Sequence, residues 1–97
     1  MAKRIVISEK PNINLSVTQG LLGQSIRFVR TSSGLTIEDA ASLSGVSKQS
    51  FSDAEQGKSG CRLNTIIKIT KALGITLHIE HPLLSENIEQ GDENEWR

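Results

Sequence analysis

The sequence predicts a small, mainly α-helical domain of four to five short helices followed by one short β-strand. Apolar residues recur at helical spacing in two separate stretches, residues 21–29 and 63–73. Between them, residues 36–57 place capping side chains and glycines where two short helices joined by a tight turn would begin and end. Residues 75–80 change to strict apolar–polar alternation, which is typical of a strand with one apolar face.

The central stretch has the pattern of a helix-turn-helix. Thr36 can cap a first helix, and Gly45 can end it because glycine readily adopts the left-handed conformation. Ser47 can then cap a second helix. Ala40 and Ala41 keep the first helix thin, so the second can cross it at close range.

At these residues the sequence resembles the Cro/repressor-like (XRE-type) helix-turn-helix family, over about residues 22–73. The resemblance rests on Ala41, Gly45, Val46, Ser47, Phe51 and the ending Glu55-Gln56-Gly57. Two positions depart from the usual pattern, since Ile37 stands where the family most often has Gln and Ser44 where a core Leu is usual. The resemblance implies a domain whose second motif helix enters the major groove of double-stranded operator DNA.

The resemblance also implies which side chains contact DNA. Lysine can donate to guanine O6 and N7 or to a phosphate, and glutamine can bond adenine N6 and N7 together. Side chains beyond the helix end are expected to hold phosphates, which fixes register without reading sequence. The expected DNA-binding residues are Ser47, Lys48, Gln49, Ser50, Ser52, Gln56 and Lys58.

A further pair follows from the resemblance. Arg30 falls late in the helix before the motif, and Glu55 precedes the final glycine of the motif. In the family such residues form a partly buried ion pair, so Arg30 and Glu55 are expected to be structural and not catalytic.

Composition and charge limit the function. The chain has 97 residues, enough for one small domain with tails. Its net charge is zero, but residues 1–73 hold ten Lys/Arg against five Asp/Glu, whereas residues 74–97 hold Arg97 against six Asp/Glu. A basic body suits a nucleic-acid partner. One cysteine, the lack of a long apolar run and the lack of a signal-peptide pattern lead us to expect a cytoplasmic protein without membrane contact.

The segments outside the motif divide the chain further. We expect an N-terminal arm at residues 1–15 with a short strand at residues 5–7. The helical domain is expected at residues 16–74. Its first helix should start at a capping box formed by Ser16 and Gln19 and run to about Ser32. A strand at 75–82 would use Ile75, Leu77 and Ile79 for dimerisation, and 83–97 would be a flexible acidic tail. The strand at 75–80 could pair with residues 5–7 of its own chain or with a second subunit.

The tail carries Trp96, a residue type enriched in binding hot spots. Together with the strand and the Ser-Lys-Gln-Ser helix start, this tail resembles that of HipB-type antitoxins. The resemblance implies that the strand builds a homodimer and that Trp96 contacts a HipA-like Ser/Thr kinase toxin. No cofactor, metal site or enzyme constellation is expected, and His78 and His81 are interpreted as surface residues.

The predicted function is therefore a sequence-specific transcriptional repressor that is also the antitoxin of a toxin–antitoxin operon. Two alternatives stay open. One is a stand-alone or phage-type repressor without a toxin. The other is a protein-interaction module that has lost DNA binding, which Ile37 and the zero net charge would favour.

Overall fold

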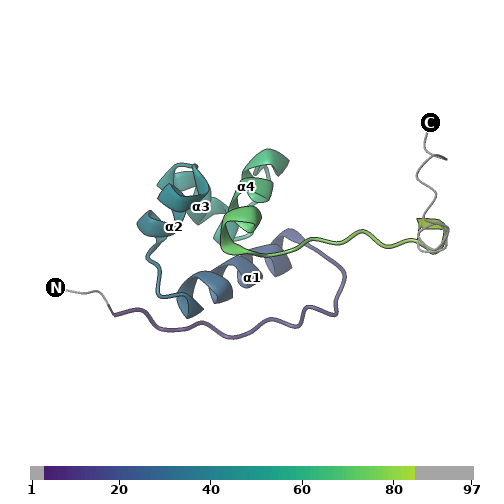
Figure 1. The fold of residues 1–97 in the computed structure, drawn as a ribbon, viewed down its shortest axis with the longest axis horizontal. Coiled ribbons are helices and arrows are strands. Elements are labelled where there is room, and N and C mark those ends of the chain that lie inside the picture. Colours follow the sequence, from purple (N-terminus) through teal and green to yellow (C-terminus); the bar gives the residue numbers. More distant parts are fainter. Residues whose placement is uncertain (1–3, 85–97) are drawn as a thin grey trace.

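The computed structural model describes residues 4–84 and contains four α-helices in that range (Figure 1). These are α1 (Gln19–Ser32), α2 (Ile37–Ser44), α3 (Lys48–Glu55) and α4 (Leu63–Leu73). The helices pack into one body, in which α3 contacts α1, α2 and α4. Residues 82–84 add a single helical turn at the edge of the described chain. The prediction of a mainly helical domain is confirmed.

The ends of α2 and α3 form at the predicted residues. The Thr36 hydroxyl accepts a hydrogen bond from the Asp39 N–H at 3.1 Å, and the Ser47 hydroxyl accepts one from the Ser50 N–H at 3.0 Å. Between the two helices Gly45 has φ of 75°, a left-handed conformation that few other residues adopt without strain. These caps fix the tight turn that orients α3 across α2.

The predicted start of α1 is wrong by two residues. Thr18, and not Ser16, is the N-cap, because the Thr18 hydroxyl accepts a hydrogen bond from the Leu21 N–H at 3.0 Å. Gln19 becomes the first helical residue, and its amide donates to the Lys58 carbonyl at 3.1 Å. The capping box therefore does not form, since its Gln side chain bonds a distant loop.

The core is small and almost entirely aliphatic. Its largest fully buried side chains come from three helices, namely Ile26, Phe51 and Ile69. Three alanines, Ala40, Ala41 and Ala54, and the slightly more exposed Ile66 complete the cluster. Phe51 is the one aromatic side chain in this cluster, because Phe28 is only half-buried.

Ser44 lies buried at the position where the resembling family usually has a core leucine. Its hydroxyl donates to the Ala40 carbonyl at 2.7 Å, so burial leaves no unsatisfied polar group. The neighbouring Leu43 is 60% exposed and does not replace the missing core leucine. The end of α2 therefore contributes a small polar side chain to the interior where the family usually has a leucine.

α1 and α3 approach each other closely at Gly23. A Cβ atom placed on Gly23 would lie 2.4 Å from the Glu55 carbonyl oxygen and 2.8 Å from that of Ala54. These are backbone atoms at the end of α3, so no side chain can move aside to make room. Only glycine permits the observed distance between the two helices.

The two predicted strands are not confirmed in the described part of the chain. Residues 75–80 continue from α4 as an extended segment, and residues 5–7 lie along α1, so the two do not pair within one chain (Figure 1). Among residues 4–84, the only backbone hydrogen bond formed by segment 75–80 joins the Ile75 N–H to the Thr70 carbonyl. The alternating pattern therefore predicts an extended conformation correctly, but no second strand pairs with this segment within residues 4–84.

Candidate nucleic-acid interface

The first turn of α3 presents polar side chains to solvent. Lys48 and Gln49 are exposed, and Ser47 lies before them as the cap. The Ser47 and Ser50 hydroxyls are 2.9 Å apart and hydrogen-bonded to each other, which holds Ser50 half-buried against the turn. Lys48 and Gln49 are therefore the residues of this turn best placed to reach an external ligand.

Two carboxylates, those of Asp53 and Glu38, engage these donors in the free protein. The Gln49 amide nitrogen donates to Asp53 Oδ1 at 2.9 Å, and Lys58 Nζ lies 3.4 Å from the same oxygen. Lys48 Nζ lies 3.3 Å from Glu38 Oε2, and both side chains are more than 60% exposed. Contacts of this kind contribute little to stability, so the donors can exchange them for an external acceptor.

The far end of α3 is held against the start of α1. A Cβ atom on Gly57, whose φ is 70°, would lie 3.1 Å from Gly20 Cα. The hydrogen bond from the Gln19 amide to the Lys58 carbonyl lies beside this contact. Gln56 itself is exposed and donates to the Ser52 hydroxyl at 3.2 Å. The loop carrying Gln56 and Lys58 is thereby fixed in position.

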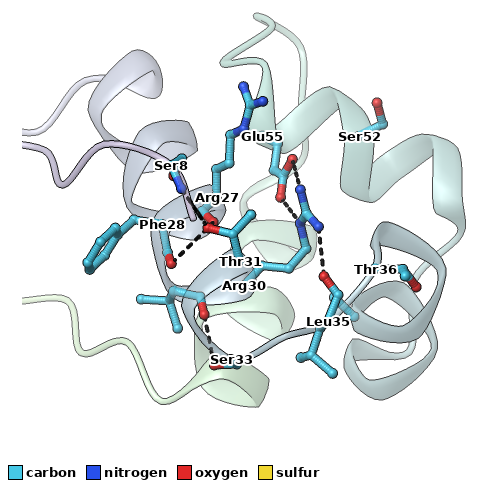
Figure 2. Close-up of polar contacts among 12 residues, drawn as sticks. Ser8, Arg27, Phe28, Arg30, Thr31, Ser33, Leu35, Thr36, Ser52 and Glu55 are labelled. Carbon is cyan, nitrogen blue, oxygen red and sulfur yellow. Dashed lines mark hydrogen bonds and ion pairs between the residues drawn. The ribbon is translucent and has the colours of Figure 1, made fainter. Parts of the chain in front are cut away.

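Beneath α3, a buried ion pair joins α1 and α3 (Figure 2). The Arg30 guanidinium donates to both carboxylate oxygens of Glu55, through Nε to Oε2 and through Nη2 to Oε1 at 3.2 Å. Its third donor, Nη1, reaches the Leu35 carbonyl at 2.8 Å in the connection to α2. The two side chains are only 10% and 7% exposed, so this pair braces the frame on which α3 sits.

A family model described as a helix-turn-helix domain matches residues 21–81 of the chain. The chain belongs to the helix-turn-helix domain family. No curated protein gives a significant match. In this helix-turn-helix domain, α2 and α3 are the two helices of the motif, and α3 holds the second position, which is that of the recognition helix in DNA-binding motifs of this kind.

The first residue of α2 is apolar, whereas the first turn of α3 is polar. Ile37 is half-buried and packs against the core cluster. It therefore offers no polar group to DNA, in keeping with its departure from the usual Gln. The nearest ion pair at this end of the domain is the exposed one between Lys48 and Glu38.

The residues predicted to build a dimer lie in the segment that follows α4. Ile75 packs against the core, Leu77 is 44% exposed and Ile79 is 86% exposed. Trp96 falls outside the described residues. Among residues 4–84, no group of three His, Cys, Asp or Glu side chains is arranged to hold a metal ion. Within the same range no helix is long and apolar enough to cross a membrane.

Sequence reasoning missed two features of this site. It gave no role to Glu38, which pairs with Lys48 ten residues later on another helix. It also did not predict that Asp53 contacts both Gln49 and Lys58. The spacing of Gln49 and Asp53, four residues apart on one helix, was a signal for the first of these contacts.

Proposed function

We propose that the chain is a sequence-specific DNA-binding repressor whose α3 reads bases in the major groove. The observation that carries the proposal is the exposed amide and ammonium of Gln49 and Lys48 on the first turn of α3, inside a helix-turn-helix domain. Adenine and guanine present the matching acceptors and donors in the major groove. Gln56 and Lys58, fixed at the other end of α3, support the proposal as phosphate contacts.

Replacing Gln49 with Ala should cost about 1–3 kcal/mol in binding at one base pair and relax the preference there. Replacing Lys58 with Ala should instead weaken binding to DNA of every sequence by a similar factor and make the salt dependence of binding shallower. Mobility-shift titrations on the upstream DNA and on unrelated DNA, at two salt concentrations, separate the two effects. If the wild-type protein shows no specific shift, the transcriptional role is wrong and the protein-interaction alternative gains.

We further propose that the active form is a homodimer built by the segment 75–80. Its unpaired backbone edge and its exposed Leu77 and Ile79 are costly in an isolated chain. The segment borders a hollow of about 750 Å³, whose walls include apolar side chains of the arm and α1 such as Leu15 and Phe28. A two-fold dimer would set two copies of α3 about 34 Å apart, on successive major grooves of a palindromic operator.

Replacing Leu77 with Asp should raise the dissociation constant of the dimer by at least about a hundredfold. Each dimer would lose two buried leucine side chains, at about 1.5–3 kcal/mol each. Thr76→Asp is the matched control, because it adds the same charge on the polar side of the alternation and should change association much less. Analytical ultracentrifugation at micromolar concentration measures both variants. A monomeric wild-type protein would contradict the dimer.

We also propose that the repressor is the antitoxin of a HipA-like kinase and represses its own operon by occupying the promoter. The support is the sequence resemblance, including the acidic residues 85–97 and Trp96, which lie outside the described structure. These residues carry five Asp/Glu against Arg97, so DNA phosphates should repel them. A basic or aromatic-lined cleft of a protein is the better partner for such a tail.

Deleting residues 85–97 should leave operator binding unchanged or slightly stronger and weaken binding to the kinase at least about tenfold. Burying Trp96 would remove up to about 250 Å² of ring from water, several kcal/mol at about 25 cal/mol per Å² before the ordering cost. Calorimetry with the neighbouring gene product, for the truncated protein and for Trp96→Ala, measures the loss. Weaker operator binding with unchanged partner affinity would contradict the tail's role. A neighbouring gene unrelated to kinases would favour a stand-alone repressor.

A further inference from the structure

The N-terminal arm is fastened to the end of α1. Residues 4–10 run along α1 in the opposite direction (Figure 1). The Ser8 N–H donates to the hydroxyl of Thr31 at 3.0 Å, and Figure 2 shows this contact. Thr31 is 6% exposed, and its hydroxyl also donates to the Arg27 carbonyl at 2.8 Å. One buried hydroxyl thus holds the arm at a defined place on the helix.

The fastened arm forms one wall of a hollow beside the helix-turn-helix motif. The hollow has a volume of about 400 Å³ and lies between the arm, the second half of α1 and the starts of α2 and α3. Four of its lining residues are basic, namely Arg4, Arg27, Arg30 and Lys48. Its one acidic lining residue is Glu38. The arm therefore adds a cation to a wall that already carries three.

Two of these four charges are not offset. Arg30 is paired with Glu55, and Lys48 is paired with Glu38. For Arg4 and Arg27, no ion pair is formed with any other residue in the range 4–84. Figure 2 shows the Arg27 guanidinium extending away from α1 without a contact to the residues drawn. The hollow consequently holds two exposed guanidinium groups, those of Arg4 and Arg27, that have no carboxylate partner within residues 4–84.

The position of this excess charge identifies its ligand. A recognition helix enters the major groove with its first residues foremost, and the preceding helix crosses the sugar–phosphate backbone. The hollow opens at the starts of both helices, next to Thr36 and Lys48. Guanidinium groups bind phosphate in a bidentate manner, and phosphate contacts supply most of the salt-dependent affinity.

We propose that Arg4 of the arm and Arg27 of α1 bind DNA phosphates beside the bases read by α3. The arm thereby extends the interface beyond the helix-turn-helix motif, and Thr31 is a positioning residue that keeps Arg4 in reach. This inference rests on the proposed DNA-binding function. It assigns a role to residues that the motif itself does not contain.

The test uses the full-length protein, an operator fragment and an unrelated DNA duplex of the same length. Arg4→Ala and Arg27→Ala should each weaken binding to both duplexes by a similar factor, roughly tenfold. The slope of log K against log salt should become shallower by about 0.9 for each phosphate that the variant no longer neutralises. Arg27→Lys should retain most of the slope, because it keeps the charge.

Thr31→Val separates positioning from direct contact. It keeps the shape of the side chain but removes the acceptor for the Ser8 N–H. It should therefore weaken binding as Arg4→Ala does, and combining the two should add little. Lys71→Ala is the control for charge alone, since Lys71 lies in the last turn of α4, and it should leave the slope unchanged.

The outcomes distinguish this inference from the function on which it rests. Unchanged slopes in Arg4→Ala and Arg27→Ala, with a wild-type protein that binds its operator, would overturn the inference alone. A wild-type protein without specific binding would overturn both. Melting curves of each variant, followed by circular dichroism, show whether the fold is retained, and Arg27→Lys decides the case if Arg27→Ala is unfolded.

Discussion

Replacing Gly23 with Ala is expected to lower the free energy of unfolding by about 3 kcal/mol. The new methyl group would lie 2.4 Å from the Glu55 carbonyl oxygen, and backbone cannot rotate away as a side chain can. α3 must therefore move off α1, which costs the packing around Phe51. The cost outweighs the gain of roughly 1 kcal/mol that alanine normally brings to a helix interior.

Gly20 supplies the matched control on the same helix. A Cβ atom there meets nothing closer than the Thr18 hydroxyl at 3.8 Å, so Gly20→Ala should stabilise the domain by up to about 1 kcal/mol. Urea unfolding followed by far-ultraviolet circular dichroism measures both variants. Equal stability of Gly23→Ala and Gly20→Ala would show that α1 and α3 are not in close contact in solution.

Replacing Arg30 with Met is expected to destabilise the domain by about 3–5 kcal/mol, because it leaves the Glu55 carboxylate buried without its partner. The Leu35 carbonyl loses a donor in the same variant. Such a loss is a large part of the total stability of a small domain, so much of the protein should be unfolded at room temperature. Thermal melts of the variant and the wild type test this.

Removing both charges should be less harmful than removing one. The double variant Arg30→Met, Glu55→Leu replaces the ion pair by apolar side chains and should recover most of the lost stability. Glu38→Gln is the control for a solvent-exposed pair. Because Lys48 and Glu38 are 64% and 63% exposed, their separation should cost less than about 1 kcal/mol. A similar loss for Glu38→Gln and Arg30→Met would contradict the importance of burial.

Local capping chemistry made the helix boundaries of the motif predictable. Thr36 and Ser47 could be assigned as caps because a hydroxyl must accept from an N–H three residues later, and Gly45 because its backbone is left-handed. The start of α1 was not predictable in the same way. Ser16 and Thr18 are both good caps, and the choice depends on Gln19 reaching the Lys58 carbonyl, a contact between distant parts of the chain.

The candidate site was predictable in its residue types but not in its contacts. Lys48 and Gln49 were assigned from the motif, and their role on DNA stays a prediction. Their partners Glu38 and Asp53 follow from how α2 and α3 cross and from which rotamers the side chains adopt. Pairing of the strand predicted at residues 75–80 was not predictable either. The alternation indicates that its apolar face must be covered, but it does not identify the chain that covers it.

The aromatic content of the chain determines which spectroscopic signals can follow its unfolding and its binding. The core contains phenylalanine as its only aromatic residue, and the whole chain has no tyrosine and a single tryptophan, Trp96. Tryptophan emission from the protein therefore comes from position 96 alone, which is not part of the sequence of α1–α4. Circular dichroism and hydrogen exchange follow the unfolding of α1–α4 directly, because they report on the helical backbone. Trp96 emission, in turn, is an intrinsic reporter for anything that binds the tail, and it needs no attached dye.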